Sequence, residues 1–207
     1  GRRDHAGFLT TTFTDAGTDI TLINDKGYDA CSYFFPDGKH LIWTSVRDKM
    51  GTSGKLEGDW SDWQHYPQGA ELYISDRQGG HVKRLTNNDY YEAEVTVSPD
   101  GKWIVFGRQI KGNMDLWVMN ADGTGEHQIT FTEDWQEGAP YFLPDSNTIL
   151  FRAWKASEYG QRPTPMTIFT IKRDGSDLKE QTHTHEMNWA PYPTPDGKHF
   201  LYVRIEP

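Results

Sequence analysis

The chain has little of several features that mark large functional classes. Among its 207 residues there is a single cysteine, Cys31, so no disulfide can form within the chain. Lys and Arg number 21 against 30 Asp and Glu, which gives a formal net charge of −9. No basic stripe is present, which argues against a nucleic-acid partner. No apolar run is long enough to cross a bilayer as a helix, so we expect no membrane insertion.

Motifs for catalysis and cofactor binding are also missing. The sequence contains no G-x-S-x-G elbow of an α/β-hydrolase, no H-E-x-x-H and no C-x-x-C-H. The segment Asp122–Gly125 is interpreted as a hairpin turn rather than a phosphate-binding loop. Cys31 is predicted to lie in a strand as a buried, inert thiol rather than a nucleophile. We therefore predict no catalytic residues, no metal and no cofactor.

The chain instead contains a repeat. Pro-Asp turns begin at residues 36, 99, 144 and 195, so successive copies lie 63, 45 and 51 residues apart. After each turn an apolar triplet stands at the same offset: Leu41–Trp43, Ile104–Phe106, Ile149–Phe151 and Phe200–Tyr202. A second half-repeat follows three of the triplets and ends in a threonine at the same offset: Thr86, Thr130 and Thr182. Several short strands per unit of this length predict a β-propeller.

The residues of the turn suit a tight change of direction. Pro presets φ, Asp bonds back to its own backbone, and Gly adopts the positive φ that such a turn requires. The third copy has Ser146-Asn147 in place of Gly-Lys, and we expect Asn147 to tolerate the left-handed region.

The P-D-G-K turn, the aliphatic–aromatic strand and the half-repeat L-W-V-M-N-A-D-G-T together resemble the TolB-type propeller repeat. That repeat occurs in periplasmic TolB proteins and in the non-catalytic propellers of prolyl-oligopeptidase-like and tricorn-like proteases. The resemblance covers roughly residues 13–203. It implies an all-β propeller of four-stranded antiparallel blades and a periplasmic or extracellular location.

The repeats divide the chain into three whole blades and two half-blades. The expected limits are a half-blade at 8–24, blades at 27–86, 89–130 and 135–182, and a half-blade at 186–207. Either the two half-blades pair to close a four-bladed ring, or the chain is a segment of a larger propeller. We favour the segment, because the resemblance implies further blades.

Two insertions, Met50–Gln68 and Lys155–Pro165, are expected between strands two and three of their blades. They therefore share a face of the propeller with the links between blades. Long loops on a rigid scaffold often carry function, and Trp, Tyr and Arg are enriched at interface hot spots. The residues predicted to bind a partner on this face are Trp60, Trp63, His65, Tyr66, Tyr90, Trp135 and Trp154. The alternative is that these rings only cover the base of the insertion or a neighbouring blade.

The strand before each Pro-Asp turn is expected to line the central channel. Four carboxylates near the start of these strands are predicted to form an acidic channel mouth: Asp29, Glu92, Glu94 and Glu137. Converging carboxylates could hold Ca²⁺ or a cationic group of a partner, but a water-filled acidic channel is the simpler interpretation. His183 and His185 are interpreted as surface residues of a blade link rather than metal ligands.

The sequence thus favours a non-catalytic binding or scaffolding module. Its partner is expected to be a protein or peptide, the remainder of its own chain, or a larger complex. Two alternatives stay open. The chain could be the propeller portion of a larger prolyl-oligopeptidase-like hydrolase, or a carbohydrate-binding propeller.

Overall fold

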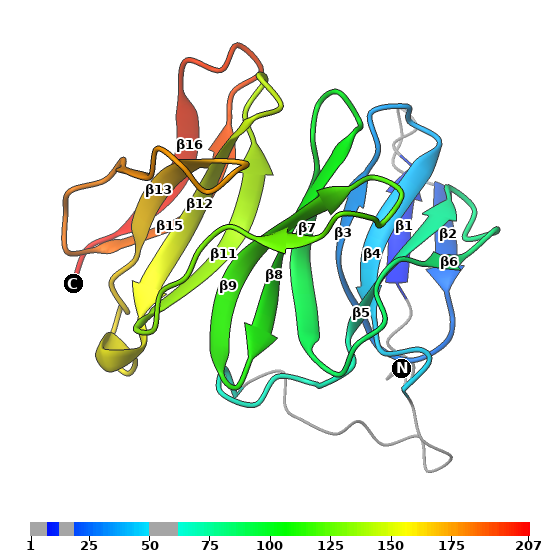
Figure 1. The fold of residues 1–207 in the computed structure, drawn as a ribbon, viewed down its shortest axis with the longest axis horizontal. Helices are drawn as coiled ribbons and strands as arrows, with labels where there is room; N and C mark the ends of the chain where they lie inside the picture. Colours follow the sequence, from blue (N-terminus) through cyan, green and yellow to red (C-terminus); the bar gives the residue numbers. More distant parts are fainter. Residues whose placement is uncertain (1–7, 13–18, 50–61) are drawn as a thin grey trace.

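The computed structural model describes residues 8–12, 19–49 and 62–207. The described residues form antiparallel β-sheets and one short 3-10 helix (Figure 1). Three sheets have four strands each and two have two strands. The predicted all-β architecture of four-stranded propeller blades is therefore confirmed.

The strands of each blade follow one another along the chain. Blade 1 contains β3 (Asp29–Phe34), β4 (His40–Ser45), β5 (Glu71–Asp76) and β6 (Lys83–Arg84). Blade 2 contains β7 (Tyr91–Val97), β8 (Trp103–Ile110), β9 (Asn113–Asn120) and β10 (His127–Gln128). Blade 3 contains β11 (Trp135–Phe142), β12 (Thr148–Lys155), the 3-10 helix η1 (Ala156–Glu158), β13 (Thr167–Lys172) and β14 (Lys179–Glu180). The two-stranded sheets contain β1 (Phe8–Thr12) with β2 (Asp19–Asn24), and β15 (Met187–Pro193) with β16 (Phe200–Ile205).

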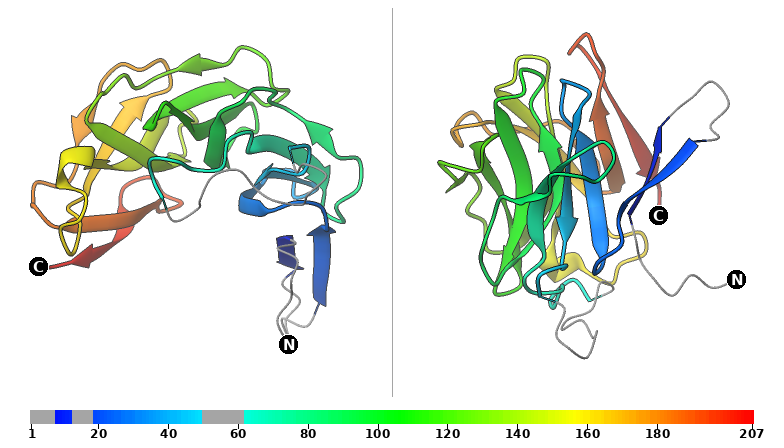
Figure 2. Two further views of the ribbon diagram at one scale, coloured as in Figure 1. Left: turned by 90° about the horizontal axis from the view of Figure 1, so that it is seen from below. Right: turned by 90° about the vertical axis from the view of Figure 1, so that its right-hand side faces the viewer.

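The sheets follow an open arc, as Figure 2 shows from below. The β1–β2 and β15–β16 pairs remain separate sheets and lie toward opposite ends of the arc. The described strands therefore do not close a four-bladed ring, and the arrangement is that of a partial propeller.

The Pro-Asp turns connect the first and second strands of each blade. In the first copy the Asp37 carboxylate accepts hydrogen bonds from the backbone N–H groups of Lys39 and His40, at 2.8 and 3.1 Å. Gly38 has φ of 64°, in the left-handed region that favours glycine. In the third copy Ser146 takes this conformation, with φ of 54°, so the residue in the left-handed region is Ser146 and the expected tolerance of Asn147 is not used.

The threonines that end the half-repeats extend the short outer strands. Each hydroxyl oxygen accepts a hydrogen bond from an N–H group near the start of the third strand, at 2.9, 2.8 and 2.9 Å. The pairs, donor first, are Leu72 with Thr86, Leu116 with Thr130 and Ile168 with Thr182. Only two residues of each fourth strand pair with the third strand. The threonine hydroxyl therefore accepts from a third-strand N–H group that the short fourth strand does not reach.

Each innermost strand contains a β-bulge that the sequence analysis did not foresee. Its register shifts at one place in every blade, and the bulged residue has positive φ. These residues are Cys31, Glu94, Ala139 and Ala190, with φ between 43° and 54°. A bulge redirects the side chains beside it, so it decides which of them face the channel.

Cys31 is exposed on the inner strand, so its predicted burial is wrong. Partial removal from water and the nearby Glu94 carboxylate nevertheless raise the pKa of its thiol to about 11. The thiolate is therefore scarce at neutral pH, which agrees with an inert cysteine.

Apolar side chains between successive blades form the core. The triplets of blades 1 to 3 are almost fully buried. One cluster joins blades 1 and 2 around Ile42, Val95 and Phe106, and another joins blades 2 and 3 around Val105, Leu116 and Phe151. Leu201 and Tyr202 in the fourth triplet are exposed, because none of the described sheets packs over them.

Candidate functional site

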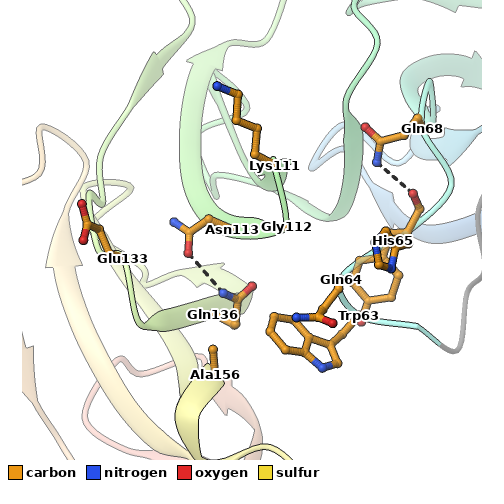
Figure 3. A pocket seen from close by; sticks show the side chains of 11 residues that line it. Trp63, Gln64, His65, Gln68, Lys111, Gly112, Asn113, Glu133, Gln136 and Ala156 are labelled. Carbon is orange, nitrogen blue, oxygen red and sulfur yellow. Dashed lines mark hydrogen bonds between the residues drawn. The ribbon is translucent and has the colours of Figure 1, made fainter.

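A cleft of about 700 Å³ opens on the face that carries the loops between second and third strands. Three stretches of chain wall it, each from a different part of the fold: Trp63–Gln68 after β4, Lys111–Asn113 between β8 and β9, and the Glu133–Gln136 region with Ala156 (Figure 3). The predicted loop face is therefore the face on which these segments converge.

The stretch after β4 is held against blade 2. The Gln109 side chain donates a hydrogen bond to the carbonyl oxygen of Trp63, at 2.5 Å. Within the stretch, the Asp62 carboxylate lies 2.7 Å from Nδ1 of His65, and the Tyr66 ring packs on Tyr91 with centroids 4.6 Å apart. These contacts position the indole of Trp63 at the edge of the cleft (Figure 3).

Three aromatic rings meet beside the cleft and link the two insertions. Trp63 packs edge-on against Trp154 at 4.9 Å between ring centroids, and Tyr159 lies 5.4 Å from Trp63 and 5.5 Å from Trp154. Trp154 is 9% exposed and Tyr159 is 50% exposed. The cluster therefore packs blade 1's insertion on blade 3 and still leaves an aromatic edge open to solvent.

Polar groups on the other walls face the cleft. The Gln136 amide donates to the Asn113 side chain at 3.1 Å and accepts from the backbone N–H of Met114 at 3.0 Å, which fixes its orientation. Lys111 and Gly112 form a tight turn with φ of 53° and 81°, and this turn projects the Lys111 amine outward (Figure 3). The side chains of Lys111 and Glu133 form no hydrogen bond or ion pair with other described residues, so both charges are available to a ligand.

The four acidic residues predicted at the channel mouth occupy different environments. Glu92 and Glu137 are 0% and 2% exposed, so they do not present charge to a solvent-filled mouth. Glu92 instead accepts from Thr86 and Asn88 of the preceding link, and Glu137 accepts from Thr132. These two carboxylates tie the links to the inner strands.

Asp29 and Asn188 occupy the equivalent positions in the other inner strands. Asp29 accepts from the Asn24 amide at 2.8 Å, and the Asn188 amide donates to the Met166 carbonyl at 2.9 Å. The position two residues before the bulged residue is thus a structural anchor in every repeat.

Of the four acidic residues, only Glu94 is a bulged residue. It lines a cavity of about 220 Å³ between the inner strands, together with Cys31 and Tyr141. Its carboxylate accepts from the Ala139 N–H at 2.9 Å and from Nη2 of Arg152 at 2.8 Å. The next blade therefore neutralises much of this charge.

Two further residues predicted to bind a partner, Trp135 and Tyr90, do not line the cleft. Trp135 packs edge-on against Phe169 at 5.5 Å, with the Lys155 amine 5.2 Å from its ring centroid. Tyr90 is exposed in the link between blades 1 and 2. Trp60 lies outside the described residues.

No cluster of three or more potential metal ligands is found within residues 8–12, 19–49 and 62–207. His183 lies 3.2 Å from Glu180, and His185 lies 3.7 Å from Glu158, so each histidine is beside one carboxylate. The same residues contain no helix with the length and apolarity needed to cross a membrane.

The sequence analysis missed several residues of the cleft, namely Gln64, Gln68, Lys111, Asn113, Glu133 and Gln136. They lie in the insertion after β4, in the β8–β9 turn, in the link before β11 and at the starts of β9 and β11, and none belongs to a motif of its own. The Lys-Gly pair between two strand-like runs was the one available signal, because it is typical of a tight hairpin turn on the loop face.

Comparison with known proteins identifies the family. Residues 36–145 match the family described as the dipeptidyl peptidase IV (DPP IV) N-terminal region. The chain belongs to this family.

Relatives agree with the family match and with the fold. The uncharacterized protein Atu1656 of Agrobacterium fabrum is 25% identical over 182 residues, which cover 83% of this chain and 53% of that protein. The chain thus spans about half the length of this curated relative.

Two solved structures superpose on the propeller. The putative TolB of Agrobacterium tumefaciens has a TM-score of 0.66 and 23% identity, over 91% of this chain and 62% of that one. TolB of Acinetobacter baumannii has a TM-score of 0.66 and 16% identity, over 90% of this chain and 40% of that one. The resemblance to TolB-type propeller repeats is thereby confirmed.

Proposed function

We propose that this propeller is a non-catalytic binding module that takes a protein or peptide segment in the cleft on its loop face. The observation that carries the proposal is the convergence of loop segments from all three whole blades around one open cleft. A rigid sheet scaffold beneath these loops holds the binding groups in place without a large entropy cost on association.

The chemistry of the walls suits a polypeptide. Trp63 offers an apolar face for one side chain of the partner, as aromatic residues do at interface hot spots. The amides of Gln64 and Gln68 can pair with peptide N–H and C=O groups. Lys111 and Glu133 supply one charge of each sign and can recognise charged side chains of the partner.

The TolB-like repeat also supports a periplasmic or extracellular location, which we include in the proposal. Fractionation of cells that produce the native protein tests this part. Recovery of the protein with the cytoplasmic fraction alone would contradict it.

A second candidate function follows from the family. A propeller of the dipeptidyl peptidase IV N-terminal type could be one part of a larger peptidase, and the chain spans only about half of its curated relative. The coding sequence that flanks residues 1–207 distinguishes the two. An α/β-hydrolase elbow encoded downstream would favour the peptidase.

The binding proposal is tested by selecting peptides from a random display library against the purified chain and measuring their affinity. Trp63→Ala should weaken the selected peptides at least about tenfold, a loss of about 1.4 kcal/mol. Lys111→Asn removes the charge and keeps a residue that tolerates positive φ, so it tests the polar wall without disturbing the turn.

Trp103→Ala is the matched control. Trp103 is also partly buried, but it stands beside the Pro-Asp turn at the opposite end of its blade, under the Arg173 guanidinium. The control should leave peptide affinity within about twofold. Equal affinity of the selected peptides for wild type, Trp63→Ala and Lys111→Asn would refute the proposed cleft, and melting curves of each variant identify any general loss of folding.

A further inference from the structure

Each whole blade places two aromatic rings opposite one another on its second and third strands. The rings are directly paired in the sheet register of all three blades. The pairs are Trp43 with Tyr73, Phe106 with Trp117, and Phe151 with Phe169. The three pairs are therefore equivalent positions of the repeat and can be compared directly.

In blades 1 and 2 an arginine covers the pair. The guanidinium carbon of Arg47 lies 5.6 and 5.7 Å from the ring centroids of Trp43 and Tyr73. That of Arg108 lies 5.3 Å from the Phe106 centroid and 4.3 Å from the Trp117 centroid. A guanidinium over aromatic faces gains cation–π attraction, most strongly where water is excluded.

Blade 2 adds an ion pair to this arrangement. Arg108 is paired with Glu92 in the sheet register, and its Nε donates to that carboxylate at 2.6 Å. Its Nη2 donates to Glu126 at 2.6 Å. The guanidinium thus lies in a slot with aromatic walls, an inner carboxylate and an outer carboxylate.

Blade 3 keeps this slot but lacks the arginine. Ala153 is paired with Glu137 as Arg108 is paired with Glu92. Within the part of the chain that the structure describes, no cationic group lies over Phe151 and Phe169. A pocket of about 160 Å³ opens there instead, lined by Trp135, Glu137, Phe151, Ala153, Phe169 and Glu180, among others.

The Glu137 carboxylate in this pocket has no arginine beside it, whereas the equivalent Glu92 in blade 2 is paired with Arg108. Glu137 is 2% exposed, its Oε1 accepts from the Thr132 hydroxyl at 2.5 Å, and its Oε2 is buried with no hydrogen-bond partner among the described residues. Burial, with the added effect of nearby Asp115, raises the pKa of this carboxyl to about 8. A buried acceptor without a partner costs about 1–3 kcal/mol, which a cation donating to Oε2 would recover.

The outer rim of the pocket carries its carboxylate at a different position from that in blade 2. Leu178 stands where Glu126 stands in blade 2, and the second carboxylate at the rim comes from Glu180 instead. The pocket therefore still offers one carboxylate at its base and one at its edge.

We propose that this pocket receives the guanidinium group of an arginine side chain from another polypeptide. The group is planar, stacks on aromatic faces and can donate to two carboxylates at once, which an ammonium matches less well. A water takes about 30 Å³ of liquid, so the pocket has room for a guanidinium and part of its methylene stem. The pocket shares no lining residue with the cleft, and the proposal does not depend on the function proposed for the cleft.

The test uses the whole chain and a pair of matched probes. Nα-acetyl-arginine methylamide is titrated against protein that is ¹³C-labelled at alanine methyl groups, and the Ala153 signal is followed. The probe with citrulline in place of arginine has nearly the same shape and a neutral urea. Titrations run at pH 8.5, on the basic side of the Glu137 pKa of about 8; the other titratable groups nearby are Asp115, Glu180 with His183 beside it, and Lys155.

We expect a saturable shift of the Ala153 signal with the arginine probe and at least tenfold weaker binding of the citrulline probe. Glu137→Gln should abolish that preference. Equal binding of the two probes, or an Ala153 signal that neither probe moves, would overturn the proposal.

Two substitutions at the floor of the pocket give an independent readout. Ala153→Arg supplies the missing guanidinium from within, as blade 2 does, and should both block the probe and raise Tm. Ala153→Leu fills the same space without a charge. It should block the probe but raise Tm less than Ala153→Arg does. A Tm for Ala153→Arg below that of Ala153→Leu at pH 8.5 would show that the pocket does not accept a guanidinium.

Discussion

The ion pair between Arg108 and Glu92 provides the sharpest test of how these blades are stabilised. Arg108 is 3% exposed and Glu92 is 0% exposed, and their closest nitrogen and oxygen atoms lie 2.5 Å apart. Burial raises the pKa of Glu92 even with the arginine beside it, so the carboxylate depends strongly on its partner. Replacing Arg108 by methionine keeps an unbranched apolar side chain at this position and removes the charged guanidinium with its hydrogen bonds to Glu92 and Glu126.

The magnitude follows from the burial of both groups. Breaking a buried pair by removing one partner costs about 3–5 kcal/mol, because the remaining charge is left uncompensated. For a chain of about 200 residues each kcal/mol lowers Tm by about 2–4 °C, so Arg108→Met should lower Tm by roughly 6–20 °C. Replacing both partners with neutral groups is far less costly. The double variant Arg108→Met with Glu92→Gln should therefore recover most of the loss.

Thermal and urea unfolding, followed by circular dichroism, measure both effects. Lys49→Met is the control, because Lys49 pairs with Asp89 at the surface and such pairs contribute about 0–1 kcal/mol. The reasoning is refuted if Arg108→Met costs no more than Lys49→Met, or if the double variant is no more stable than the single one.

Two further predictions concern the inner strand of blade 3. Gly138→Ala should cost about 1 kcal/mol in urea unfolding, because its Cβ would lie 2.0 Å from Glu94 Oε2 and 2.5 Å from an Arg152 nitrogen, and moving these two side-chain ends apart disturbs the hydrogen bond between them; an unchanged midpoint would contradict this. The pKa of Glu137 is raised from 4.5 to about 8 by folding, so the stability that it contributes is complete below about pH 4.5 and is lost as pH rises through 8. Glu137→Gln should flatten the pH dependence of Tm over that range, and a wild-type Tm that does not fall there would contradict the assignment.

Much of the fold could be predicted because its signals are local. The Pro-Asp-Gly turns depend on φ preferences within four residues, and the triplets such as Ile104–Phe106 are buried in blades 1 to 3 as their apolarity indicates. The repeat shows that a threonine such as Thr130 recurs at one offset, but it does not show that the Thr130 hydroxyl accepts a hydrogen bond from the Leu116 N–H.

The site was less predictable because contacts between distant segments create it. The sequence placed both insertions on one face, and the described part of the first insertion does contact blade 3 there, through Trp63 and Trp154. It also placed Glu92 at a channel mouth, whereas the adjacent bulge turns Glu94 to the channel and leaves Glu92 buried. That prediction relied only on the position of the carboxylates near the start of the inner strand. A bulge inserts one residue and so shifts the strand alternation that decides which side chains face the channel.

The amino-acid sequence by itself determined the repeat, the blade order, the turns and the face on which the insertions lie. The tertiary structure alone decided which carboxylates are buried, which loops enclose the cleft, and that Ala153 leaves a pocket where Arg108 fills one. Periodicity reports the backbone conformation of neighbouring residues. The cleft and the pocket depend instead on side-chain volumes and charges brought together from different strands and blades, and no local pattern records them.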